Sequence, residues 1–136
     1  MNEVEKVNHP THYNQHPSGI ECIDLVEEFN FNFGNAIKYL WRCGKKNNVE
    51  ASEDIRKAKF YIDREFDRLK KVHKPEYITN DMLNSITAYK MSKNLTIDIS
   101  YMIEKIISSD PNYLLSKVLK SVISNEDPRI HFQDLK

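Results

Sequence analysis

Between residues 52 and 73 the chain repeats its apolar side chains with the period of an amphipathic α-helix. Ser52 stands where an N-cap residue belongs, and the acidic pair Glu53 and Asp54 favours the positive N-terminal end of a helix dipole. The apolar positions form one seam: Ile55, Ala58, Ile62, Phe66 and Leu69. Such a seam predicts a helix that buries one face against a neighbouring helix, in the same subunit or in another.

Helical periodicity also marks the segments on both sides of this seam. We expect helices over residues 20–29, 35–43, 80–93 and 97–108, and a further one from near Pro111 to Ile123. The apolar face of the first helix is expected to consist of Ile20, Ile23, Val26 and Phe29. Gly44 stands where a left-handed C-cap residue would end the second helix. No stretch alternates apolar and polar side chains as a strand does, so the predicted fold class is all-α.

The expected organisation is a compact domain of about three helices followed by an extension of about three more. Its parts are an N-terminal arm over residues 1–18, a helical domain over 19–73, the extension over 79–124 and a tail over 125–136. The seven-residue seam and the apolar C-terminal helices predict a homo-oligomer, at least a dimer, with the extension as a candidate for the subunit contacts.

Charge and hydropathy limit the classes of partner. The 20 basic side chains balance the 20 acidic ones, so no net field attracts sequence-specific nucleic acid or an anionic membrane. We expect no membrane span, since no apolar run reaches about 18 residues, and no signal peptide at the acidic, polar N-terminus. Cys22 and Cys43 are expected to be small packing residues of a protein in the reducing cytoplasm.

Glycine is scarce, with only Gly19, Gly34 and Gly44 in the whole chain. A P-loop needs two glycines flanking four residues and a following Lys-Ser or Lys-Thr, so that backbone amides can wrap a phosphate. Gly44 is followed by two lysines but lacks the upstream glycine and the hydroxyl. The sequence therefore excludes Walker-type and dinucleotide-fold nucleotide binding.

Cationic and aromatic side chains recur at helical spacing on two predicted helices. Lys38, Arg42 and Lys45 share one face of the helix over 35–43, and a similar stripe follows on the helix over 52–73: Lys57, Tyr61, Arg64 and Arg68. If the two helices pack through their apolar seams, the stripes would flank one groove. Arginine and lysine suit phosphate oxygens, and the rings of Tyr13, Tyr39 or Tyr61 would stack on a base. The alternative is a solvated face with ion pairs such as Asp54 with Lys57.

The arm adds His9, His12 and His16. Three interpretations stay open for them: phosphate or base contacts, structural hydrogen bonds, and metal ligation, for which the loop spacing gives little support. The acidic residues Glu21, Asp24 and Glu27 resemble half of the Mg²⁺ cage found in all-α nucleotide pyrophosphohydrolases. The helix expected to face them offers Asp54 among basic residues, so the second half is missing. We therefore assign no catalytic residue and expect no metal cofactor.

Four sequence blocks, in the same order, resemble the SaV-like family of bacteriophage proteins over residues 6–71. The blocks are His9-Pro10-x-His12-Tyr13, residues 19–24, residues 34–42, and residues 53–64 with the pattern Glu-Asp-Ile-x-Lys-Ala-x-x-Tyr-Ile-x-Arg. The resemblance implies a phage origin, a setting in the cytoplasm of the infected cell, and the label of nucleotide kinase that members often carry. If that label applies, it implies that His9, His12, Lys38, Arg42, Lys57 and Arg64 contact phosphate.

Three functions follow as hypotheses. The first is a binding protein that sequesters a nucleotide, such as a cyclic nucleotide immune signal, as a counter-defence sponge. The second is a P-loop-independent deoxynucleoside monophosphate kinase, which would use Mg²⁺ and position its substrates by charge. The third is a module that docks on a host protein. Sequestration ranks first, with a ligand-binding set of His9, His12, Tyr13, Lys38, Tyr39, Arg42, Lys57, Tyr61 and Arg64.

Overall fold

The computed structural model describes residues 3–8, 10–14, 16–43, 45, 50–72, 96–109, 112–124 and 126–133. All regular elements in these ranges are helices, which confirms the all-α class. In chain order they are α1 (Glu3–Asn8), α2 (Thr11–Asn14), α3 (Cys22–Val26), α4 (Phe31–Arg42), α5 (Ala51–Val72), α7 (Thr96–Ser109), α8 (Tyr113–Ser124) and the 3-10 helix η2 (Pro128–Phe132). The helix expected over residues 80–93 and the cap expected at Gly44 lie outside the described residues.

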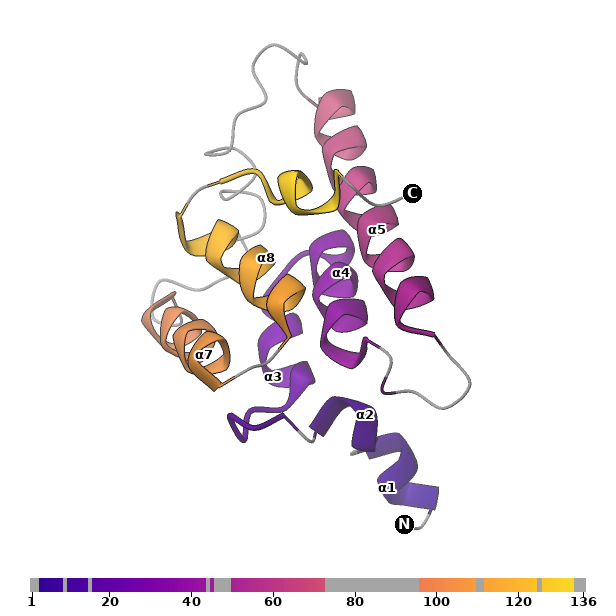
Figure 1. Cartoon of the computed structure of the whole chain (residues 1–136), viewed down its shortest axis with the longest axis vertical. Coiled ribbons are helices and arrows are strands. Elements are labelled where there is room, and N and C mark those ends of the chain that lie inside the picture. The colour runs from indigo at the N-terminus through magenta and orange to yellow at the C-terminus, as the bar shows by residue number, and fades with distance from the viewer. Residues whose placement is uncertain are drawn as a thin grey trace.

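Helix α4 is the centre of the packing. It lies alongside α5 on one side and contacts α8 on the other, while α2 and α3 pack against it (Figure 1). Helix α7 packs on α8, and η2 crosses from α8 to α5. The buried side chains form a single cluster that draws on all of these layers, from Trp41 in α4 to Ile103 in α7 and Phe132 in η2.

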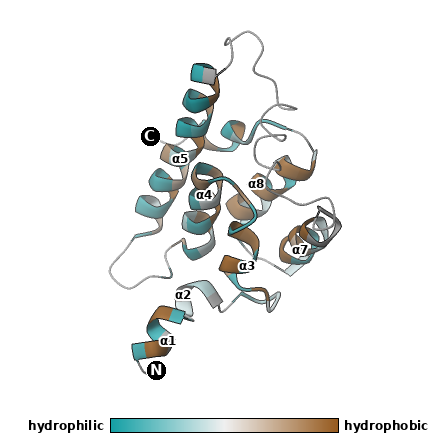
Figure 2. Ribbon diagram, turned by 180° about the vertical axis from the view of Figure 1, so that it is seen from behind, coloured by the Kyte–Doolittle hydropathy of each residue, from teal (hydrophilic) through white to brown (hydrophobic). Residues whose placement is uncertain are grey.

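The seam on α5 is confirmed. Ala58, Ile62, Phe66 and Leu69 are buried, and Ile55 is half-buried against the same cluster. The opposite side of α5 is hydrophilic (Figure 2). Because this seam packs within the chain, it is not available as the subunit contact that the sequence also allowed. The helix begins at Ala51, so the N-cap position is Glu50, two residues before the expected Ser52, and the carbonyl of Glu50 accepts the first helical hydrogen bonds.

The first core helix is shorter than expected and buries a different face. Glu21 has extended backbone and caps a helix of five residues, so Ile20 lies before the helix and Phe29 lies after it. The buried residues are Cys22, Leu25 and Phe29, whereas Ile23, expected to face the core, is 56% exposed. The burial of Cys22 confirms its expected role in packing, and Cys43 is half-buried; both are free thiols.

Helix α4 begins four residues before the expected start. The side chain of Asn30 accepts a hydrogen bond of 2.9 Å from the amide of Phe33 and so caps the helix at Phe31. Gly34 lies within this added turn, where a Cβ would stand 3.0 Å from the carbonyl oxygen of Val26. The glycine therefore lets α4 approach the end of α3 closely.

The predicted arm and the predicted tail both contain helical turns in their described residues. The arm contains α1 and α2, and the predicted tail contains η2, whose Asp127 side chain caps it through the amide of Arg129. Phe132 is 2% exposed, and the Arg129 guanidinium lies 3.5 Å from the centroid of the Phe66 ring. Within the predicted tail over 125–136, the described η2 packs on α5 through the buried Phe132. No helix within the described ranges is long and apolar enough to cross a membrane.

Candidate functional site

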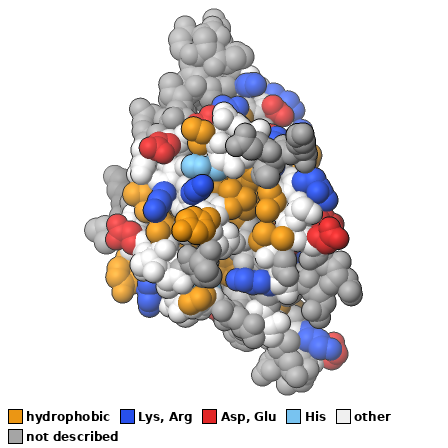
Figure 3. Space-filling view, in the orientation of Figure 1, with side chains coloured by type: hydrophobic (Ala, Val, Ile, Leu, Met, Phe, Trp, Pro, Cys, Tyr) orange, Lys and Arg blue, Asp and Glu red, His pale blue; other side chains and the backbone are white. Residues whose placement is uncertain are grey.

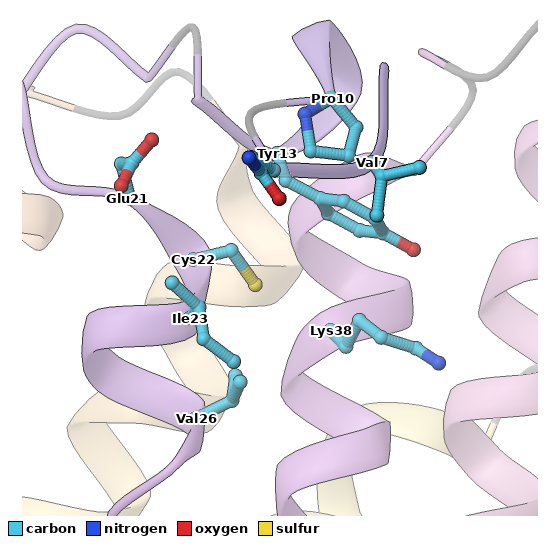
Figure 4. A pocket seen from close by; sticks show the side chains of 9 residues that line it. Val7, Pro10, Tyr13, Glu21, Cys22, Ile23, Val26 and Lys38 are labelled. Atoms are coloured by element: carbon cyan, nitrogen blue, oxygen red, sulfur yellow. The ribbon is translucent and has the colours of Figure 1, made fainter. Parts of the chain in front are cut away.

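A pocket of about 260 Å³ lies where α1, α2, α3 and α4 meet (Figure 4). Among the described residues, its wall is mostly apolar, with one carboxylate and one ammonium group. The lining residues are Val7, Asn8, Pro10, Tyr13, Glu21, Cys22, Ile23, Val26 and Lys38. Tyr13 and Lys38 extend to the same side of α4 in this view. Two of the residues predicted to bind ligand, Tyr13 and Lys38, therefore line one pocket.

The connection between α2 and α3 leads to Glu21 and Cys22, which line this pocket. Gly19 has φ of 79°, in the left-handed region that favours glycine, and its amide donates to the carbonyl of His16 at 3.0 Å. The Nδ1 atom of His16 lies 2.7 Å from the Ser18 hydroxyl, and the imidazole lies 4.8 Å from the Trp41 ring between centroids. Because His16 is buried in these contacts, it is a structural residue of the turn. His9 and the side chain of His12 lie outside the described residues.

Arg42 is buried and is not among the described residues that line the pocket. Its Nε donates a hydrogen bond of 3.0 Å to Oδ1 of Asp54, and Nη1 reaches the Tyr13 hydroxyl at 3.5 Å. Burial lowers the pKa of Arg42, but the hydrogen bonds to Asp54 and Tyr13 outweigh that effect and raise it. The structure therefore places this predicted phosphate contact in a network that ties α2, α4 and α5 together.

A second group of predicted residues surrounds the Tyr39 ring. The Nζ atoms of Lys38 and Lys57 lie 4.6 Å and 5.4 Å from the ring centroid, and the Arg42 guanidinium lies 4.7 Å from it. Tyr61 stacks on Tyr39 with a centroid separation of 5.9 Å and an interplanar angle of 9°. We call these five residues the Tyr39 cluster. They come from α4 and α5, as the predicted pairing of the two stripes requires.

The cations of the α5 stripe also form ion pairs outside the Tyr39 cluster or lie apart from it. Lys57 also pairs with Glu53 at 3.1 Å, and Arg68 pairs with the buried Glu65. Arg64 is exposed and belongs to none of the contacts described for the Tyr39 cluster. Lysine, arginine and acidic side chains are interspersed around apolar ones on the face shown in Figure 3, in keeping with the zero net charge. Three cations gather beside Tyr39, of which Arg42 is paired with Asp54 and Lys57 with Glu53.

Lys38 joins the two features, because it lines the pocket and also stands over Tyr39. The pocket wall also contains two groups that can lose a proton, the Cys22 thiol and the Tyr13 hydroxyl. Burial raises the pKa of the Cys22 thiol to about 12, and the charges of Lys38 and Lys45 lower it only in part. Burial also raises the pKa of Tyr13, against the opposing effect of Arg42. Both groups are thus protonated near neutral pH and present uncharged surface to a ligand.

Sequence reasoning missed the apolar wall. Val7, Pro10, Ile23 and Val26 carry no ligand signature, and Ile23 was expected in the core. The signal that would have found them is an apolar residue on the outer side of a short helix next to a structured arm. Within the part of the chain that the structure describes, no three His, Cys, Asp or Glu side chains lie close enough to hold a metal ion.

Residues 7–63 match a family model described as a protein of unknown function, DUF3310. The match supports a relation to a family of domains of unknown function over this part of the chain. It includes every residue that lines the pocket and every member of the Tyr39 cluster. No curated protein and no solved structure matches the chain.

Proposed function

We propose that the protein binds a nucleotide, with the base in the apolar pocket and the phosphate over Lys38 and the Tyr39 cluster. The observation that carries the proposal is the position of Lys38, which lines the pocket and stands 4.6 Å from the Tyr39 ring. An apolar pocket beside a cation is complementary to a nucleotide, which has a flat and largely apolar base next to an anion. Lys57 adds a second partly exposed cation on the phosphate side.

The size of the pocket limits what it can enclose. Sites for drug-sized ligands have volumes of roughly 300–1,000 Å³, and this pocket has about 260 Å³. It would therefore accept one base with its sugar and leave the phosphate outside. A ligand held in this way is selected by its base and retained by charge-assisted contacts to its phosphate.

We further propose that binding serves sequestration. Affinity alone suffices for a protein that withholds a nucleotide from another receptor, and the described pocket residues include no activated nucleophile, since burial keeps the Cys22 thiol protonated. The phage origin and the host-cytoplasmic setting that the SaV-like resemblance implies, and the counter-defence role hypothesised from the sequence, belong to this proposal. Its competitor is the nucleoside monophosphate kinase.

A thermal-shift screen tests the proposal. The purified protein is heated with each ribo- and deoxynucleoside monophosphate, with and without Mg²⁺ and ATP, and the ligand is then recovered and identified by chromatography. A ligand at about 100 times its Kd would stabilise the fold by roughly 2.7 kcal/mol, and we expect it to be recovered unchanged. Conversion to a diphosphate would show a kinase instead. The absence of a shift with every nucleotide would contradict nucleotide binding.

A further inference from the structure

A second hollow lies next to the pocket, at the C-terminal end of α3. It has a volume of about 180 Å³ and lies against the loop between α3 and α4 and the first two turns of α4. Val26 and Lys38 line both hollows. The two spaces therefore meet at an apolar side chain and a cation.

An exposed aromatic ring lines the second hollow. Phe31 is 72% exposed, although it is the first residue of α4, and its only described ring contact is an edge-on approach to Tyr61 at 6.0 Å. Leaving a phenylalanine in water forgoes about 1.5–3 kcal/mol of burial, so such a ring is suited to covering by a partner. Asn35, half-buried in the same wall, provides an amide donor and acceptor.

We infer that the ligand is a dinucleotide, with one base in the pocket, the second base on Phe31, and the linking phosphate at Lys38. The inference rests on the proposed function and specifies the ligand class. The ligand's parts would follow the order base, phosphate, base. Among the described lining residues of the two hollows, Lys38 is the one ammonium group, and it lies where they meet. Aromatic stacking holds any base, because every base has a π face.

The occupant is a dinucleotide and not a protein segment for reasons of charge and volume. A protein side chain would fill the apolar hollows but would leave Lys38 without an anion, whereas a phosphodiester supplies one. Together the hollows are too small for a helix and each suits one ring with its sugar. Linear and cyclic dinucleotides share this chemistry, and the experiment separates them.

The test is a set of calorimetric titrations with three probes built on the base that stabilises the protein most as a monophosphate: the mononucleotide, the 5′-phosphorylated linear dinucleotide and the cyclic dinucleotide. We expect at least one dinucleotide to bind roughly 5- to 150-fold more tightly than the mononucleotide, the range for stacking of one base. Phe31→Ala should remove that gain and leave mononucleotide affinity unchanged.

Phe60→Ala is the matched control, because Phe60 is also exposed and also contacts Tyr61 but lines neither hollow. It should leave all three affinities unchanged. If the mononucleotide binds as tightly as both dinucleotides, or Phe31→Ala changes nothing, the dinucleotide inference is wrong and the proposed function stands. If none of the three probes binds, the proposed function fails as well.

Discussion

The Nε atom of Arg42 donates a hydrogen bond of 3.0 Å to Oδ1 of Asp54, whose side chain is completely buried. This pair joins α4 to α5, and the Tyr13 hydroxyl extends it to α2. Removing one partner of a buried ion pair leaves an uncompensated charge and costs about 3–5 kcal/mol. Arg42 therefore belongs to the framework that positions the site.

We expect Asp54→Ala to lower the free energy of unfolding by about 3–5 kcal/mol in urea denaturation. The double variant Arg42→Met, Asp54→Leu should recover most of that loss, because apolar side chains of similar volume replace both charges. A loss below about 1 kcal/mol for Asp54→Ala, the usual value of an exposed pair, would contradict the buried pair. For the same reason Arg42→Ala is a poor probe of ligand binding.

Phe132 should anchor the C-terminal segment to the core. Phe132→Ala is expected to lower the free energy of unfolding by about 3–5 kcal/mol, from lost burial and a cavity against α5. Ile130→Ala, in the same segment but 58% exposed, should stay within about 0.5 kcal/mol of wild type. Equal effects of the two substitutions in urea denaturation would show that η2 does not pack as described.

The sequence predicts the buried face of a helix most securely where the helix is long and its apolar residues repeat regularly. The α5 seam runs from Ile55 to Leu69, about four turns of the helix, so its face is defined by several residues that agree. Helix α3 has five residues, fewer than two turns, so it offers too few positions to define a buried face by periodicity. Periodicity alone placed Ile23 on the wrong face for that reason.

The site was predictable in its charges and not in its cavity. Helical spacing predicted stripes on two helices that include Lys38, Lys57 and Tyr61, and the structure brings these three residues around Tyr39. Spacing could not reveal that Arg42 turns inward, because that depends on Asp54 being buried by its neighbours. Nor could it reveal the pocket, whose wall combines the arm with α3 and α4.

His131 should make the protein less stable in mild acid. Burial lowers its pKa below the usual 6.5, and the Lys117 charge adds to this effect while Glu126 opposes it. A depressed pKa means that the neutral form is favoured on folding, so this contribution is complete above about pH 6.5 and is lost as the pH falls through the folded-state pKa. The imidazole Nε2 lies 2.9 Å from the Ser121 hydroxyl.

His131→Gln should keep a polar group near Ser121 without titrating. Thermal unfolding from pH 7.5 to pH 5 should therefore show a smaller fall of Tm for this variant than for wild type. An identical fall for both proteins would show that His131 does not contribute to the pH dependence.

Lys38 should contribute most to the affinity for a phosphate-bearing ligand. Hydrogen bonds to charged groups contribute about 1.5–3 kcal/mol, so Lys38→Met is expected to weaken nucleotide binding roughly 10- to 100-fold in calorimetric titration. Lys57→Met should have a smaller effect, since Lys57 is more distant from the pocket and pairs with Glu53. Lys59→Met, on the same helix but paired with Asp63, is the control and should bind like wild type.

The location of the ligand is tested most directly by two-dimensional amide NMR of the labelled protein during titration with the most stabilising mononucleotide. We expect saturable shift changes at the amides of Cys22, Ile23, Val26 and Lys38, which line the pocket, and at Tyr39. Arg129 and Phe132, which line a separate hollow between α5 and η2, should not shift. Changes confined to that second region, or none at saturating ligand, would contradict nucleotide binding in the α1–α4 pocket.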